Sequence, residues 1–187
     1  MVLAFLRAEA NSARWGNAFA NLDRRLINEP ELTDPAQNTA RADALAAHRG
    51  DVRARTGFFQ GLPLDTTWQR WAVTPAELGG VLYANYVTWI KLSGGTRRIR
   101  DGSANVQRLQ VFESHDINAG IRATARAIDE GQPMPELIAV AQAADGRDLV
   151  LLEGHTRATA YLVARHPPKE VTIIVGWSTT MNRWHWF

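Results

Sequence analysis

The sequence predicts an α+β fold in which an all-helical N-terminal region, residues 1–100, precedes a small mixed-sheet domain, residues 101–187. Three observations favour this organisation. The first half is rich in alanine and shows little alternation of apolar and polar residues, which is typical of helices. After Gly102, apolar runs typical of strands alternate with helical patterns. A chain of 187 residues is long enough for one such domain with a helical extension.

The N-terminal region is expected to contain several helices. Apolar side chains recur near helical spacing from Val2 to Asn28, and a second helix is predicted over 39–48. Thr74 to Glu77 has the pattern of a capping box with proline at the first helical position, so a helix is predicted from Pro75 to about Leu92. Aromatic residues crowd this region, and packing is their expected role, with a ligand box as the alternative. They are Trp68, Trp71, Tyr83, Tyr86 and Trp89.

The C-terminal half is expected to run strand, helix, strand, strand, helix, strand. Asp116 is a plausible N-cap for the first helix, whose apolar residues recur at helical spacing until Gly131. Asp145-Gly146 joins two apolar runs and predicts a β-hairpin. The predicted strands are 106–112, 137–143, 149–152 and 171–175, and the second helix is 156–165.

Composition removes several classes of site. The chain has no cysteine, which excludes disulfides, thiolate nucleophiles and cysteine-based metal sites and agrees with a cytoplasmic location. No apolar run approaches the roughly 18 residues that span a bilayer, so no membrane partner is expected. The net charge of +2 does not by itself indicate nucleic acid, and DNA or RNA is not the favoured partner.

One dense basic run follows Gly94-Gly95 and contains Arg97, Arg98 and Arg100. Such a run is most often a solvated surface, and the alternative is a contact with an anion or a nucleic acid.

The residues that carry chemistry are predicted at the turn from Glu153 to Arg157, which joins an apolar strand to a helix. Gly154 has no Cβ, so a phosphate can approach the backbone, where the amides and the positive end of the following helix favour an anion. Arg157 adds a bidentate donor, and His155 and Thr156 add further side-chain donors. A purely structural turn is the alternative.

The stretch from Ile117 to Tyr161, which ends in LLEGHTRATAYL, resembles the ParB/sulfiredoxin superfamily, also described as the ParB-like nuclease-domain fold. The corresponding turn is GERR in ParB proteins, GCHR in sulfiredoxins and DGHHR in the ParB-like free-serine kinases, and the kinase variant is the most similar. Sulfiredoxin chemistry needs a cysteine that this turn lacks, and no helix-turn-helix segment follows the motif. Sulfinic-acid reduction is therefore excluded, and ParB-type centromere binding is not expected.

The resemblance implies that Gly154, His155, Thr156 and Arg157 lie against the phosphates of ATP or another nucleotide. It implies Glu153, His155 and an acidic residue before the first helix of this domain as candidate catalytic residues. Glu113 is the candidate base for a small hydroxyl acceptor, Asp116 is the second choice, and the alternative is that Asp116 is only an N-cap. Mg²⁺ bridging the phosphate oxygens, held through Glu153 or Glu113, would suit phosphoryl transfer, although no motif specifies a metal site.

Three functions follow from these residues: a nucleotide-dependent phosphotransferase or NTP hydrolase, a module that binds nucleotide or nucleic acid without catalysis, and a regulatory domain. The tryptophan-rich ending, residues 176–187, is expected to pack against the domain core or the N-terminal helices, and an aromatic platform for a base is the alternative.

Overall fold

The computed structural model describes residues 1–10, 12, 16–108 and 115–187. Its helices are α1 Val2–Ala10, α2 Arg25–Asn28, α3 Pro35–Arg49, α4 Pro75–Leu78, α5 Val87–Leu92, α6 Ile99–Gln107, α7 His115–Asp129 and α8 His155–Val163. Its strands are β1 Thr67–Val73, β2 Leu137–Ala141, β3 Val150–Glu153 and β4 Val171–Trp177, and short 3-10 helices occur at Gly16–Phe19, Gly57–Phe59 and Met181–Arg183. The predicted α+β class is confirmed.

The four strands form one mixed sheet in the order β1-β4-β2-β3. Strand β4 is antiparallel to β1 and parallel to β2, while β2 and β3 form an antiparallel hairpin. Beyond the β3 edge, the Leu82 N–H donates to the Leu149 carbonyl, and the Leu151 N–H donates to the Leu82 carbonyl. The chain that follows Leu82 therefore runs alongside the end of β3, where the candidate turn begins.

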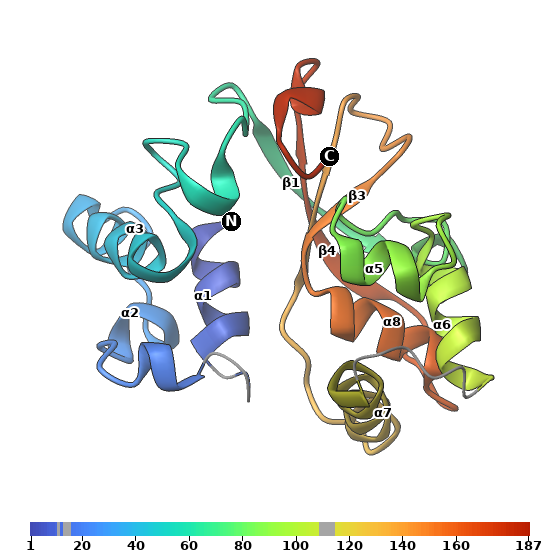
Figure 1. Cartoon of the computed structure of the whole chain (residues 1–187). Helices are drawn as coiled ribbons and strands as arrows, with labels where there is room; N and C mark the ends of the chain where they lie inside the picture. Colours follow the sequence, from blue (N-terminus) through green and yellow to red (C-terminus); the bar gives the residue numbers. More distant parts are fainter. Residues whose placement is uncertain (11, 13–15, 109–114) are drawn as a thin grey trace.

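The sheet lies between two layers of helices (Figure 1). One face packs on the N-terminal helices, and the other packs on α6, α7 and α8. The first cluster includes Phe5, Leu6, Leu45, Phe59, Ile138, Val140, Leu152 and Ile174. The second includes Ile99, Val106, Ile121, Ala125, Leu137, Ala139, Leu151, Ala158 and Ile173. In the part of the chain that the structure describes, no helix is both long and apolar enough to cross a membrane.

The N-terminal region is not all-helical, because Thr67–Val73 forms the edge strand β1. Trp68 and Trp71 are three residues apart, which is a helical spacing, but an odd separation on a strand points two side chains to opposite faces. Accordingly, Trp68 packs with the first cluster and Trp71 with the second. The predicted division at residue 101 falls within α6 and stays a prediction.

Two further elements differ from the prediction. The helix expected over 75–92 is broken into α4 and α5, because Leu82 leaves the helical path to pair beside β3. The strand expected over 106–112 is wrong at Val106 and Gln107, which end helix α6, while residues 109–112 lie outside the described part. Val106 is buried with Ile99 two helical turns earlier, so a helical spacing accounts for both apolar residues.

Most local predictions are confirmed. The capping box is present, with the Glu77 N–H donating to the Thr74 hydroxyl and the Thr74 N–H donating to the Glu77 carboxylate. The predicted hairpin is β2–β3, and Gly146 in its connection has a φ of +70°. The helices predicted from Asp116 and Thr156 correspond to α7 and α8.

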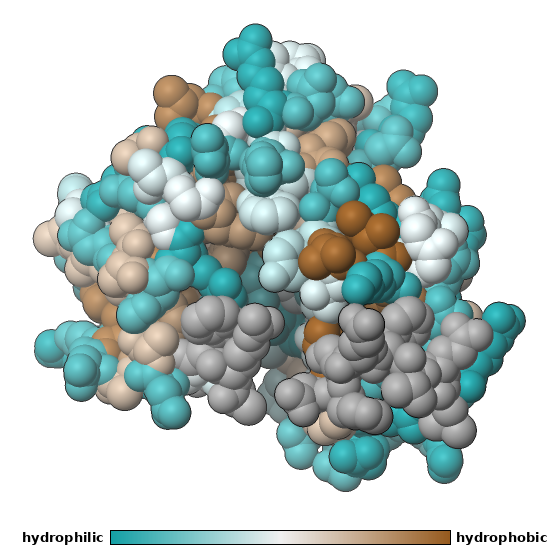
Figure 2. All heavy atoms as spheres, viewed as in Figure 1, coloured by the Kyte–Doolittle hydropathy of each residue, from teal (hydrophilic) through white to brown (hydrophobic). Residues whose placement is uncertain are grey.

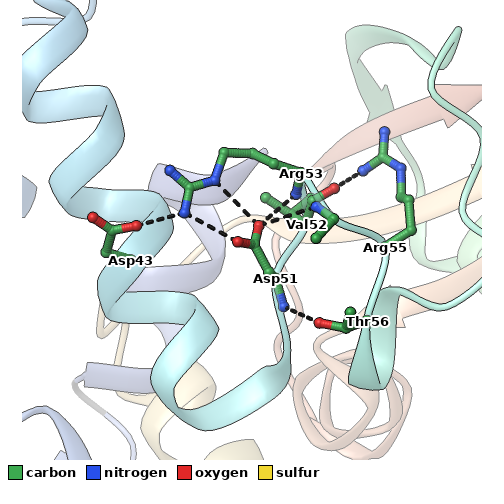
Figure 3. Close-up of polar contacts among 7 residues, drawn as sticks. Asp43, Asp51, Val52, Arg53, Arg55 and Thr56 are labelled. Atoms are coloured by element: carbon green, nitrogen blue, oxygen red, sulfur yellow. Dashed lines mark hydrogen bonds and ion pairs between the residues drawn. The ribbon is translucent and has the colours of Figure 1, made fainter.

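A loop rich in charged residues, 50–56, follows α3 and is held by hydrogen bonds among its own residues (Figure 3). Asp51 accepts hydrogen bonds from the Arg53 and Ala54 N–H groups and from the Arg53 guanidinium, while its own N–H donates to the Thr56 hydroxyl. The hydrogen bonds from Arg53 lower the pKa of Asp51 to about 2. Just before this loop, Arg49 at the end of α3 forms an ion pair with Glu9 of α1, and this ion pair helps to hold α3 against α1.

The C-terminal ending packs back on the N-terminal half, as predicted. Trp184 is buried, and its indole N–H donates to the Phe58 carbonyl over 2.9 Å. Gly61, with a φ of +80°, lets the two backbones approach, because a Cβ there would lie 1.9 Å from the Arg183 carbonyl oxygen. Trp184 belongs to the same core cluster as the N-terminal helices, so the ending is part of the core.

Candidate functional site

The candidate turn lies where β3 ends and α8 begins. Gly154 has φ +97° and ψ 21°, a left-handed conformation that glycine adopts without strain. A Cβ at this position would lie 2.5 Å from the Leu137 side chain and 3.2 Å from an Arg157 guanidinium nitrogen. The turn therefore depends on glycine for its backbone conformation and for the close approach of Leu137 and Arg157.

The N-terminus of α8 has no side-chain cap. Its N-cap residue is Gly154, and no acidic residue occurs in the first turn of the helix. The first hydrogen bond along the helix runs from the Ala158 N–H to the Gly154 carbonyl over 2.7 Å. The amides before it have no partner within the helix, and together with the helix dipole they favour an anion.

The Arg157 guanidinium folds back over Gly154 and is already paired. It donates to the carboxylate of Glu153, at the end of β3, and, over 3.4 Å, to the Glu136 carbonyl. Both side chains of the ion pair are mostly buried, and the Arg157 Nε is buried with no hydrogen-bond partner among the described residues. An anion at this turn would find a fixed cation, but it would compete with Glu153 for it.

Glu136 connects the turn to the far edge of the sheet. While its carbonyl accepts from Arg157, its carboxylate accepts from Arg70 of β1 over 2.7 Å. Arg70 pairs with Ile174, Ile174 with Ile138 and Ile138 with Glu153, with a shift of register in the β2–β3 pair between Ile138 and Ala139. Glu136 therefore links the turn at the end of β3 to β1 at the opposite edge of the sheet.

The His155 ring packs inward. It stacks on Trp89 with ring centroids 5.0 Å apart, and its Nε2 accepts a hydrogen bond from the Ala84 N–H over 3.3 Å. Burial, aided by the nearby charges of Arg157 and Arg49, lowers the pKa of His155 to about 3. His155 is therefore neutral at physiological pH, and the nitrogen that accepts from Ala84 is not available as a donor to a phosphate.

The remaining predicted site residues are distributed unevenly. Thr156 lies beside His155 in the first turn of α8 and is partly buried. Glu113 lies outside the described residues. Asp116 is the second residue of α7, because the helix already begins at His115, so the prediction that Asp116 is its N-cap is wrong. Where the chain is described, no cluster of three or more metal-ligating side chains occurs.

The basic run forms local backbone contacts. Arg97 donates to the Tyr83 carbonyl and Arg98 to the Gly80 carbonyl, and burial lowers the pKa of Arg97. Arg98 and Arg100 are exposed. These bonds hold the segment after Gly80 beside α6, so at least part of the run has a structural role.

Two shallow hollows flank Tyr161, toward the other end of α8 from the turn. One has a volume of about 300 Å³ and is bordered by Pro75, Arg100 and Pro167; the other, of about 330 Å³, is bordered by Gly131, Met134 and His166. Neither includes a residue of the turn.

Sequence reasoning grouped Tyr83 and Trp89 with packing residues and did not connect them to the turn. The structure brings both rings against His155, and the backbone of Ala84 binds its imidazole. No spacing in the sequence indicates this, because Ala84 and His155 are 71 residues apart.

Comparison of the chain with protein-family models, with curated proteins and with solved structures found no match in any of the three.

Proposed function

We propose that the protein binds a nucleotide, ATP or another, whose phosphate groups occupy the turn from Gly154 to Arg157. The observation that carries this proposal is an uncapped helix N-terminus at a left-handed glycine with an arginine guanidinium folded over it. Backbone amides, the helix dipole and a bidentate cation then converge on one position. The similarity of the turn to those of the ParB/sulfiredoxin superfamily supports the same ligand.

Binding requires a change of partner at Arg157. In the described conformation Glu153 holds the guanidinium, and the Arg157 Nε has no acceptor. A phosphate offers several acceptor oxygens and more negative charge than one carboxylate, so it can satisfy Nε and displace Glu153. The displaced carboxylate is then free to hold a Mg²⁺ ion through one oxygen and water molecules.

Phosphoryl transfer to a small hydroxyl acceptor would need a base near the terminal phosphate. Among the candidates, Glu153 is held by Arg157, and His155 is held by Ala84 and Trp89. Glu113 remains the first candidate, with Asp116 as the second choice, so replacement of Glu113 tests transfer separately from binding. If transfer occurs, Glu113→Gln abolishes turnover and preserves nucleotide binding; if Glu113 has no such role, turnover is unchanged.

Calorimetry with ATP, ADP, CTP and GTP in the presence of Mg²⁺ tests the proposal. We expect saturable binding of at least one nucleotide, weakened about 10-fold or more in Arg157→Ala because a hydrogen bond to a charged group contributes about 1.5–3 kcal/mol. Arg147→Ala is the matched control, since Arg147 is an exposed arginine paired with Asp145. No binding by any nucleotide, or equal binding by both variants, would contradict the proposal.

Calorimetry with DNA or RNA as the ligand tests the alternative function, a module that binds nucleic acid. Binding of DNA or RNA that weakens steeply with salt and depends on the exposed Arg98 and Arg100, rather than on Arg157, would favour that function.

A further inference from the structure

Three nearly parallel rings lie at the start of α8. Trp89 stacks on Tyr83 at 5.2 Å and on His155 at 5.0 Å, while Tyr83 and His155 are 6.1 Å apart with an interplanar angle of 16°. Two rings on opposite faces of an indole would be at least about 7 Å apart, twice the normal contact distance between carbon atoms. Tyr83 and His155 therefore lie on the same face of Trp89.

The opposite face of Trp89 carries no aromatic ring among the described residues, and the residue is only partly buried. Helix α5, to which Trp89 belongs, begins beside Tyr86 and Val87, whose exposed fractions are 46% and 58%. Figure 2 shows hydrophobic side chains at the surface over this helix. The apolar and aromatic surface over α5 therefore adjoins the turn, because Trp89 stacks on His155, the residue that follows Gly154.

The C-terminal segment borders the same surface. The Asn85 N–H donates to the Trp186 carbonyl over 2.8 Å, and the Tyr86 and Trp186 rings meet edge to face at 5.5 Å. The Trp186 indole N–H is buried and has no acceptor among the described residues. A buried donor without an acceptor is destabilising, and a ring nitrogen, a carbonyl or a ribose hydroxyl of a ligand would satisfy it once the ligand displaced the groups that cover the indole N–H.

We infer that Trp89, with Tyr86 and Trp186 beside it, is the platform on which the base of a bound nucleotide stacks. This inference rests on the proposed phosphate site, because the surface is a base platform only if the phosphates lie at Gly154 to Arg157. Each base presents a flat π-face, so stacking on tryptophan suits nucleotides of any sequence. His155 has a positioning role, since its ring supports the inner face of Trp89.

Calorimetry with ATP and with inorganic tripolyphosphate separates the base from the phosphates. Stacking of one base predicts that the wild-type protein binds ATP roughly 5- to 150-fold more tightly than tripolyphosphate. Trp89→Leu should remove that difference while leaving tripolyphosphate binding unchanged, and Trp89→Phe should retain part of it. Trp71→Leu is the matched control, because Trp71 is a partly buried tryptophan on β1 that packs over Gly146.

Four results would overturn the platform. The first is equal binding of ATP and tripolyphosphate by the wild-type protein, and the second is an equal reduction of the preference for ATP in Trp71→Leu and Trp89→Leu. The third is a Trp89→Leu variant that has a wild-type circular dichroism spectrum but binds both ligands equally more weakly. Self-association that Val87→Asp abolishes, without a change in the preference for ATP, would assign the surface to a second copy. Failure of both ligands to bind the wild-type protein instead contradicts the proposed phosphate site itself.

Discussion

The lowered pKa of His155, whose imidazole packs against Trp89, predicts a specific dependence of stability on pH. Burial holds the pKa of His155 at about 3 in the folded protein, compared with 6.5 for an exposed histidine. Between these values the unfolded chain binds a proton that the folded protein does not bind, so the free energy of unfolding falls as the pH falls. Linkage gives about 1.4 kcal/mol per pH unit below about pH 6.5, or about 2 kcal/mol between pH 8 and pH 5.

Urea unfolding of the wild-type protein and of His155→Phe at pH 8 and pH 5 measures this contribution. Phenylalanine keeps an aromatic ring against Trp89 but does not titrate, so the variant should lack the loss of about 2 kcal/mol. His166→Gln is the control for the loss of a histidine, because the His166 side chain is 81% exposed. A wild-type protein that is equally stable at both pH values, or a His155→Phe variant that keeps the full loss, would refute the reasoning.

Three further predictions follow from the ion pair, the C-terminal ending and the loop after α3. Glu153→Gln removes the competitor for Arg157, so pyrophosphate measured with EDTA should bind roughly fivefold more tightly, and weaker binding would contradict the competition. Trp184→Ala should lower the free energy of unfolding in urea by about 3–5 kcal/mol, whereas an unchanged value would mean that the ending is not part of the core. Asp51→Asn should speed tryptic cleavage after Arg53, and an unchanged rate would show that the Asp51 hydrogen bonds do not order the loop.

Local patterns made much of the C-terminal half predictable. The β2–β3 hairpin, helix α7 and the turn into α8 each depend on residues close in sequence, such as Asp145-Gly146 and Gly154. The pairing of Glu153 with Arg157 is also a local contact, since it joins two residues four apart across the turn from β3 into α8.

The features that local patterns did not predict depend on pairing between segments far apart in the chain. Strand β1 exists because Thr67–Val73 pairs with the last strand of the chain, and Leu82 leaves its helix to bond beside β3. The surroundings of His155 depend in turn on this course of the chain, which places Ala84 and Trp89 against it. Local signals in the first half therefore predicted α3 correctly, whereas the capping box at Thr74 correctly marked a helix start but not the end of that helix at Leu78.

The measurement that tests the central claim most directly is a titration of ¹⁵N-labelled protein with ATP, followed by the chemical shifts of the backbone amides. Phosphate binding at the turn predicts that the largest shifts occur at His155, Thr156 and Arg157, together with the Arg157 Nε–H, which has no acceptor among the residues that the structure describes. Saturable shifts centred on Arg98 and Arg100, with the first turn of α8 unchanged, would contradict the claim.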